Sequence, residues 1–282
     1  MENFEWRWRT HDNLELFSRG WTPEPAPKAV ICLVHGSGER TNRYGHVASA
    51  LVEAGYAVVG CDLRGHGLSE GQRGHTPGLE YFLNDITEFL KQLDLRYPGY
   101  PKVLYGHSLG GNLAANYLLR VKSAVLGGML TGPYFRLSFE PPAAKIALGR
   151  MMSNISPKFS QETGLETAAL SRDPQVVRAY VTDPLVHDLV SARMFVSVME
   201  AGEWALEHAA ELNAPVLLMH GAADRLTSAV ASQDFARRAG QKVKFILWEG
   251  FYHEIHNEPE RAEVFKVMID WLEAQVAARH QA

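Results

Sequence analysis

Short apolar runs alternate with helical patterns along most of this chain, and this arrangement most constrains its fold. Residues 29–34 are all apolar, whereas a strand with one solvated face would alternate apolar and polar residues. Similar runs follow at 56–61, 103–105, 124–130, 215–219 and 243–248. Runs of this kind are typical of strands that are buried on both faces, as in a parallel sheet covered by helices.

Helical patterns lie between most of these runs. One apolar helix face is formed by Leu79, Phe82, Leu83, Ile86, Leu90 and Leu93. A later helix is predicted at 259–278, with Pro259 in its first turn, and alternation at Phe4, Trp6 and Trp8 predicts an N-terminal antiparallel hairpin. Together these patterns predict an α/β fold with a mostly parallel, doubly wound sheet of about eight strands.

The stretch between Pro133 and Pro215 contains no convincing strand. It holds helix-compatible segments at 143–152, 174–180 and 191–209, and a structureless loop of this length would be unusual in one domain. We therefore expect an inserted helical cap. The predicted division is a core at 1–133, a cap or lid at 134–212 and the rest of the core at 213–282, all in a single catalytic domain.

Composition excludes several classes of protein. The 282 residues carry a net charge of −4, which is a poor match for a nucleic-acid phosphate backbone. The N-terminus lacks the apolar segment of a secretory signal, and no apolar run is long enough to span a membrane. Cys32 and Cys61 sit in apolar runs and are expected to be buried thiols. A cytoplasmic protein without nucleic-acid partners is predicted, and no oligomeric state is predicted.

A glycine-rich turn at 106–111 holds the first candidate for chemistry. It follows the apolar run at 103–105 and precedes a helix-compatible segment at 112–119. A nucleophile elbow needs this strand–turn–helix context, because the sharp turn holds the hydroxyl of a serine, here Ser108, outward. Taken alone, the motif is better explained as an ordinary glycine-rich turn.

Two later residues change that interpretation. Asp224 follows the apolar run at 215–219, and His253 follows the run at 243–248. Ligands of parallel α/β sheets bind at the carboxyl ends of the strands, so Ser108, Asp224 and His253 are expected to meet there. Their order along the chain is a known order of catalytic triads.

The chemistry explains these residue types. A serine hydroxyl is a weak nucleophile until a base takes its proton, and His253 would be that base. Asp224 would fix the imidazole tautomer and stabilise its charged form. The negative tetrahedral oxygen needs hydrogen-bond donors, which we expect from the backbone N–H of Leu109 and from the loop at 35–38.

Other histidines compete for the role of base. Structural hydrogen bonds are the expected role of His35, His107 and His220, which lie at tight turns. His66 is a further competitor, and His256 lies three residues after His253 and could face the same way. A metal site at His253 and His256, with Glu254 and Glu258, lacks the H-E-x-x-H spacing, so no metal and no cofactor are predicted.

The sequence resembles the monoglyceride lipase and lysophospholipase branch of the α/β-hydrolases, which is also described as serine aminopeptidase-like. The resemblance covers nearly the whole chain. It depends on the segments at 35–44, 62–71, 106–111 and 182–185, together with Asp224 and the pair at 252–253. It implies an α/β-hydrolase fold, the triad Ser108, Asp224 and His253, and an oxyanion hole formed by the backbone N–H groups of Ser37 and Leu109.

The resemblance also implies a substrate, a monoacylglycerol that is cleaved to fatty acid and glycerol through an acyl-enzyme on Ser108. The polar pocket for the glycerol head group would use Glu39, Arg43, His107 and Tyr180. A lysophospholipase and a short- or medium-chain carboxylesterase are the alternatives that share this chemistry. A binding protein without turnover is disfavoured because every part of the machinery is present, and an aminopeptidase is disfavoured because the cap shows no acidic cluster. At most, weak peripheral membrane contact through the cap is expected.

Overall fold

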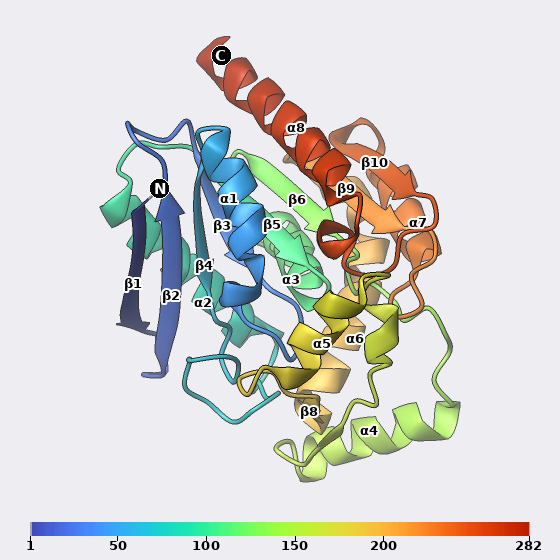
Figure 1. The fold of residues 1–282 in the computed structure, drawn as a ribbon. Helices are drawn as coiled ribbons and strands as arrows, with labels where there is room; N and C mark the ends of the chain where they lie inside the picture. The colour runs from blue at the N-terminus through green and yellow to red at the C-terminus, as the bar shows by residue number, and fades with distance from the viewer. Residues whose placement is uncertain (1, 282) are drawn as a thin grey trace.

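An eight-stranded sheet forms the centre of the molecule (Figure 1). The computed structural model describes residues 2–281. The strands are β1 (Glu2–Arg9), β2 (Glu15–Thr22), β3 (Val30–Val34), β4 (Ala57–Cys61), β5 (Lys102–His107), β6 (Gly127–Thr131), β9 (Val216–Gly221) and β10 (Val243–Trp248). Their order is β1-β2-β4-β3-β5-β6-β9-β10, and every pair from β4 to β10 is parallel. The predicted α/β fold with a mostly parallel sheet is confirmed.

The central strands are buried on both faces, as their unbroken apolar sequences predicted. In β3, Val30, Cys32 and Val34 join one hydrophobic cluster. Ile31 and Leu33, which point to the opposite face, join another. The antiparallel pairing of β1 with β2 confirms the predicted N-terminal hairpin.

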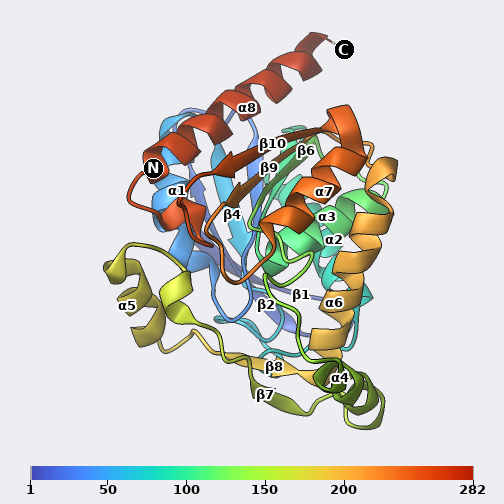
Figure 2. The same ribbon diagram turned by 90° about the vertical axis from the view of Figure 1, so that its right-hand side faces the viewer.

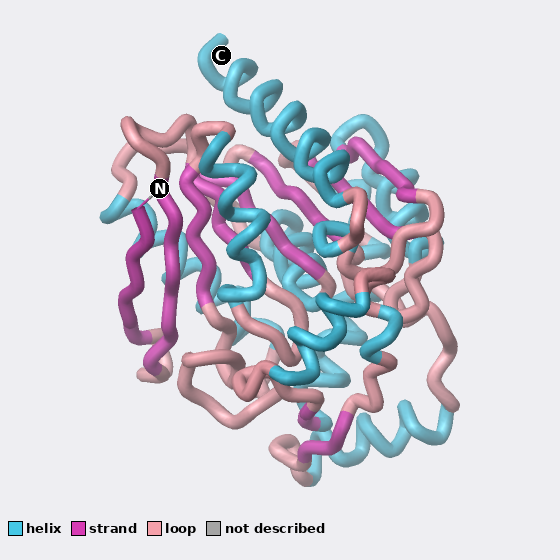
Figure 3. Tube along the Cα trace, in the orientation of Figure 1, coloured by secondary structure: helices cyan, strands magenta, loops and turns pink. Residues whose placement is uncertain are grey.

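Helices cover both faces of the sheet (Figure 3). Apolar residues of α2, α3, α6 and α7 pack in one cluster, and those of α1 and α8 pack in the other. The helices are α1 (Gly45–Glu53), α2 (Leu79–Arg96), α3 (Leu109–Arg120), α4 (Ala143–Ile155), α5 (Pro174–Thr182), α6 (Ala192–Glu207), α7 (Ala229–Ala239) and α8 (Arg261–Gln281). Five short 3₁₀ helices lie at 41–44, 167–169, 209–211, 240–242 and 255–257.

The segment between β6 and β9 lies beyond one end of the sheet, where α4, α5 and a small second sheet are found (Figure 2). That sheet pairs β7 (Ser160–Glu162) with β8 (Leu189–Ser191). The prediction that this segment lacks strands was therefore wrong in detail, because strands of three residues are too short to show a periodicity. Helix α6 instead packs on α3, where Asn112 donates to the Val198 carbonyl at 3.1 Å.

Cys32 and Cys61 are buried and are not joined in a disulfide. Among residues 2–281, no helix combines the length and the apolar composition that crossing a membrane requires.

Candidate active site

Ser108 lies at the turn between β5 and α3, and its backbone is strained. Its φ is 53° and its ψ is −115°, in a region that residues other than glycine rarely adopt. Three hydrogen bonds hold this conformation. The Ser108 N–H donates to the Thr131 carbonyl, and the Ser108 carbonyl accepts from the N–H groups of Asn112 and Tyr134, each at 3.0 Å. Such strain, held by surrounding structure, is typical of functional sites.

Two glycines make this sharp turn possible. A Cβ atom at Gly106 would lie 2.2 Å from the Gly110 carbonyl oxygen, and one at Gly110 would lie 1.9 Å from the Val34 carbonyl oxygen. Any larger residue at either position would therefore push the helix away from the strands. This is the steric reason for the small residues on both sides of Ser108.

Asp224 and His253 meet in a buried ion pair at the carboxyl ends of β9 and β10. The Nδ1 atom of His253 lies 2.7 Å from Oδ2 of Asp224, and the exposed fractions of the two side chains are 4% and 0%. Since a carboxylate only accepts hydrogen bonds, Nδ1 carries the proton and donates it. In a neutral ring, Nε2 is then left as the basic nitrogen. His253 and Ser108 line the same pocket.

The charges of this pair depend on each other. Burial opposes the charged imidazolium, but the Asp224 carboxylate outweighs it and raises the pKa of His253 above its usual value. Burial also opposes the carboxylate, but His253 and the hydrogen bond from His220 hold the pKa of Asp224 well below its usual range. Asp224 is therefore ionised at neutral pH, ready to stabilise a proton on His253.

The candidate oxyanion hole lies between two backbone segments. Ser37 belongs to the loop after β3, and Leu109 is the first residue of α3. Within residues 2–281, neither of these N–H groups donates to a protein acceptor. The Glu39 side chain holds the loop, because its Oε1 accepts the N–H of Gly36 at 2.7 Å. The loop is thus positioned before any substrate arrives, which is the condition for stabilising an oxyanion effectively.

Glu39 and Arg43 form a buried polar cluster together with Glu254. Arg43 donates to the two oxygens of Glu254 at 2.7 and 2.8 Å, and it also pairs with Glu39. The hydroxyl of Tyr44 donates to Glu39 at 2.7 Å. Arg43 holds the pKa of Glu254 well below its usual range, although burial alone would raise it. Two carboxylates and one guanidinium leave this cluster with one net negative charge.

His107 and Tyr180 lie beside this cluster, and both line the pocket with Glu39 and Glu254. The Arg43 guanidinium stacks over the Tyr180 ring, with Cζ 4.8 Å from the ring centroid. Burial and the neighbouring His253 lower the pKa of His107 to about 3, so its imidazole is neutral. Its Nδ1 lies 3.0 Å from the Thr131 carbonyl oxygen, a structural hydrogen bond as predicted. Three of the four residues that the resemblance assigned to head-group binding, Glu39, His107 and Tyr180, thus line the pocket. Arg43 contacts Glu39 and Tyr180 but is not among the described lining residues.

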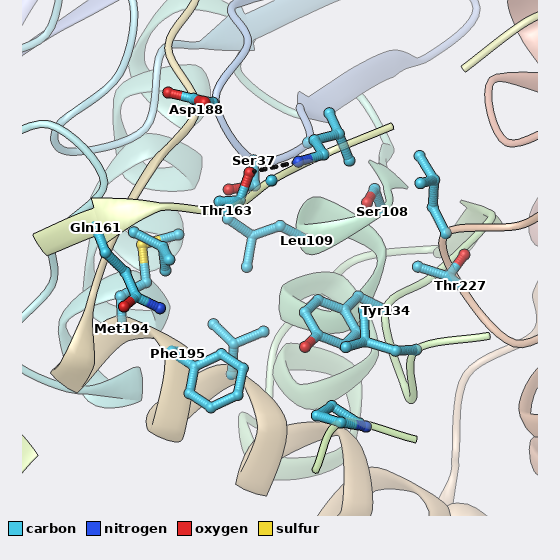
Figure 4. A pocket seen from close by; sticks show the side chains of 18 of the residues that line it. Ser37, Ser108, Leu109, Tyr134, Gln161, Thr163, Asp188, Met194, Phe195 and Thr227 are labelled. Atoms are coloured by element: carbon cyan, nitrogen blue, oxygen red, sulfur yellow. Dashed lines mark hydrogen bonds between the residues drawn. The ribbon is translucent and has the colours of Figure 1, made fainter. Parts of the chain in front are cut away.

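The pocket has a volume of about 380 Å³. Figure 4 shows Ser108 and Leu109 in the pocket wall, with Tyr134 and Phe195 on the side toward α6. Helix α4 adds Leu148, Gly149 and Met152. More than half of the surface of Leu148 is exposed to solvent, so the pocket opens along α4. One lining therefore combines the polar cluster, apolar residues of α4 and α6, and Ser108.

The competing histidines have structural partners. Nδ1 of His35 contacts the Gly36 carbonyl at 2.7 Å, and its Nε2 accepts the N–H of Leu63 at 2.9 Å. Nδ1 of His66 contacts the Arg64 carbonyl at 2.9 Å. His256 stacks on the Tyr44 ring at a centroid distance of 4.9 Å. His220 also lies close to the buried acid, with its Nε2 3.0 Å from Oδ2 of Asp224, but it is not among the described residues that line the pocket. His253 both pairs with Asp224 and lines the pocket with Ser108.

The carboxylates of the alternative metal site are engaged in ion pairs. Glu254 pairs with Arg43, and Glu258 accepts from Arg172 Nε at 2.7 Å. A different group, His11 with Asp12 and Asp85, has atoms close enough to hold a cation. However, both of its carboxylates pair with Arg64, at 2.9 and 2.6 Å. An ion there would have to displace a buried guanidinium.

Sequence reasoning missed two residues of the site. Thr227 lines the pocket, and its Oγ1 lies 2.9 Å from Oδ2 of Asp224 and 3.2 Å from Nδ1 of His253. Glu254 was considered only as a metal ligand, and its contact with Arg43 spans 211 residues of chain. No local pattern marks either residue. The available signal was their proximity in the chain, because Thr227 lies three positions after Asp224 and Glu254 directly follows His253.

The pH dependence of catalysis follows from the His253 environment. His253 must be neutral to accept a proton, so activity is lost as the pH falls through its pKa. Because Asp224 raises that pKa, we expect the acidic limb of kcat/KM to have its midpoint above the usual histidine value of about 6.5. The measurement is kcat/KM for a p-nitrophenyl ester between pH 5 and 9. A midpoint below the usual value would contradict this electrostatic account.

Comparisons with known proteins agree on one family. The family model described as "Serine aminopeptidase, S33" matches residues 25–260. A monoacylglycerol lipase of Mycolicibacterium smegmatis is 34% identical over 254 residues, which cover 89% of this chain and 90% of that protein. An uncharacterized abhydrolase domain-containing protein of Dictyostelium discoideum is also 34% identical, over 95% of this chain, and this chain spans only 28% of its length.

A solved structure gives the same result. The crystal structure of Paleococcus ferrophilus monoacylglycerol lipase matches with a TM-score of 0.83 and 32% sequence identity. The match covers 98% of this chain and 100% of that chain. The similarity therefore extends over the core and over the segment between β6 and β9.

Proposed function

Because this chain belongs to the serine aminopeptidase (S33) family and has an α/β-hydrolase fold, we propose that it hydrolyses monoacylglycerols to fatty acid and glycerol through an acyl-enzyme on Ser108. The chain is a hydrolase, as its relatives are. Its similarity to two monoacylglycerol lipases over most of its length supports this substrate. No cofactor is part of the proposal.

The proposed mechanism uses the triad in the usual two stages. His253 takes the proton of the Ser108 hydroxyl as its oxygen attacks the ester carbonyl carbon. The N–H groups of Ser37 and Leu109 stabilise the negative oxygen of the tetrahedral intermediate. When that intermediate collapses, the ester C–O bond breaks and His253 gives its proton to the departing glycerol oxygen. A water molecule, deprotonated by His253, then attacks the acyl-enzyme carbonyl carbon. When this second intermediate collapses, the bond to Oγ of Ser108 breaks, His253 returns the proton to Oγ, and the fatty acid leaves.

The observation that carries the substrate proposal is a pocket whose lining combines Ser108 with buried polar residues and with apolar residues of α4 and α6. The buried cluster of Glu39, Arg43 and Glu254 offers carboxylate acceptors for hydroxyl groups, as glycerol requires. The apolar residues of α4 and α6 suit an acyl chain. The net negative charge of the cluster disfavours a phosphate beside the ester, so it favours a monoacylglycerol over a lysophospholipid.

We also propose that residues 134–212 act as the cap and rest weakly on lipid surfaces. Three large apolar residues of α4, Leu148, Met151 and Ile155, are 49–73% exposed. Such a patch binds a lipid surface by burying its apolar area. The proposed cellular location is the cytoplasm.

A comparison of substrates tests the proposed function. We expect turnover of monooleoylglycerol to exceed that of lysophosphatidylcholine and of p-nitrophenyl butyrate, each compared by kcat/KM in the same detergent. Higher kcat/KM for lysophosphatidylcholine would establish the lysophospholipase instead. A marked preference for the short ester would establish a carboxylesterase. Ester hydrolysis that is unchanged in Ser108→Ala would show that this serine is not the nucleophile.

The chain-length preference is expected to depend on Gly149. This glycine lies inside α4, where glycine costs about 0.5–1 kcal/mol relative to alanine, and a Cβ atom there would meet only the Phe195 ring, at 3.4 Å. We predict that Gly149→Leu lowers kcat/KM for C16–C18 monoacylglycerols about tenfold or more relative to C8, because the new side chain narrows the pocket where α4 lines it.

A matched variant of the same helix controls for general effects. Ala147 is exposed and is not among the pocket-lining residues that the structure describes. Ala147→Leu should therefore leave the chain-length profile unchanged. Equal profiles for Gly149→Leu and the wild type, with both proteins folded, would show that acyl chains do not pass this position.

A further inference from the structure

The side chain of His220 has a fully buried position behind the candidate triad. It lies near the end of β9, and its exposed fraction is 0%. Among the described residues, the pocket lining includes Thr227 but not His220. His220 therefore cannot touch a substrate in the pocket. Nothing in the proposed mechanism uses it, yet both of its ring nitrogens have polar partners.

The partners of His220 fix its tautomer. Nε2 lies 3.0 Å from Oδ2 of Asp224, and Nδ1 lies 2.8 Å from Oγ of Ser232 in α7. Nε2 also lies 3.3 Å from the Thr227 carbonyl oxygen. Because the Asp224 carboxylate and this carbonyl only accept, Nε2 must carry a proton. In the neutral ring, Nδ1 then accepts the hydrogen of the Ser232 hydroxyl. Oδ2 of Asp224 thus lies within 3.0 Å of a protonated ring nitrogen from each of two histidines.

Several donors surround the two oxygens of the Asp224 carboxylate. Its Oδ1 accepts the backbone N–H groups of Leu226 and Thr227, at 2.7 and 3.0 Å. Its Oδ2 lies within 3.0 Å of His253, His220 and the Thr227 hydroxyl. Each hydrogen bond to a carboxylate stabilises its charge. A carboxylate with more donors is a weaker acceptor for any one of them. His220 therefore reduces the stabilisation that the Asp224 carboxylate gives to protonated His253.

We propose that His220 is a positioning residue, which orients Asp224 and tunes the basicity of His253 through their shared carboxylate oxygen. The inference rests on the proposed triad. Without the His220 donor, more of the Asp224 charge would act on His253 and would favour its protonated form. The acidic limb of kcat/KM would then move to higher pH.

Replacing His220 leaves the other charged and titratable groups around His253 unchanged. Glu254 and Glu39 favour the charged form of His253, and the His107 ring lies 4.7 Å from the His253 ring. None of these three groups hydrogen-bonds to His220 among the described residues. The groups that connect His220 to His253 are the Asp224 carboxylate and the Thr227 hydroxyl, which lies 3.3 Å from Nε2 of His220 and 3.2 Å from Nδ1 of His253. A change in the pH profile on replacing His220 therefore reports an effect carried to His253 by these two groups.

The test compares the pH profiles of kcat/KM for p-nitrophenyl butyrate in three proteins. His220→Leu removes the donor, and we expect its acidic limb to shift upward by about half a unit or more. His220→Gln retains an N–H donor at a similar distance along the side chain, and its limb should return close to that of the wild type. KM should change little in either variant, because His220 lies outside the pocket lining.

Controls separate this inference from folding and from the proposed function. If His220→Leu does not fold, His220→Met fills the space without an N–H donor and is measured instead. His208→Leu, at a histidine that contacts the Trp204 carbonyl on α6, should leave the limb in place. An unchanged or downward-shifted limb in the donor-free variant would overturn the inference. Wild-type rates in Ser108→Ala would instead overturn the proposed function.

Discussion

Replacing Ser108 with alanine is expected to lower kcat for monooleoylglycerol by about 10⁴-fold or more, because no other group can form the acyl-enzyme. The remaining rate would come from binding and from the oxyanion hole alone. The variant keeps a Cβ atom at the strained turn, where φ is 53°, so the backbone conformation should persist. The measurement is fatty-acid release by the purified variant. Its preparation must be free of wild-type protein, whose activity would otherwise set the measured rate.

Thermal unfolding provides the control for this variant. Alanine removes one partly exposed hydroxyl, and surface changes of this kind alter stability by about 0.5 kcal/mol or less. The midpoint of thermal unfolding of Ser108→Ala should therefore stay within a few degrees of the wild-type midpoint. A folded variant that retains more than about a tenth of the wild-type kcat would refute the assignment of Ser108 as nucleophile.

Asp224→Asn is expected to lower kcat by about 10⁴-fold while the protein stays folded. Oδ1 accepts two backbone N–H groups, so the asparagine oxygen is held at that position. The amide nitrogen must then face His253, where it donates to Nδ1 and places the ring proton on Nε2. A ring in this tautomer cannot accept the Ser108 proton. The loss thus comes from the wrong tautomer rather than from disrupted packing.

Asp224→Glu is the informative companion to this variant. It keeps the negative charge but adds a methylene group in a fully buried space, so it tests position rather than charge. We expect partial activity, between that of Asp224→Asn and the wild type, measured as kcat at the pH optimum of each protein. A loss of less than tenfold in Asp224→Asn would mean that another acid supports His253.

The fold was largely predictable because burial on both faces leaves a direct mark in the sequence. The run at 29–34 could be assigned to a covered parallel strand, and β3 occupies all but its first residue. The glycine pair around Ser108 was equally informative, since only small residues fit between Val34 and the elbow. Where a residue type is required by sterics in one short segment, the sequence alone is sufficient.

Contacts between distant segments were less accessible. The ion pair of Arg43 with Glu254 joins residues that are 211 positions apart, and the paired strands β7 and β8 have three residues each. Neither produces a periodic pattern. The position of His220 behind Asp224 depends on the turn after β9, whose geometry the amino-acid types did not reveal. The cap and the outer partners of the triad were therefore the parts that needed a structure.

The most direct test of the central claim is a titration with a fluorophosphonate. Monooleoylglycerol hydrolysis is measured as the reagent is incorporated, and the labelled peptide is identified by mass spectrometry. We predict that hydrolysis falls in proportion to the label and reaches zero at one equivalent per chain, with the label on Ser108. Turnover that persists in fully labelled protein, or unlabelled protein that does not hydrolyse monooleoylglycerol, would contradict the account.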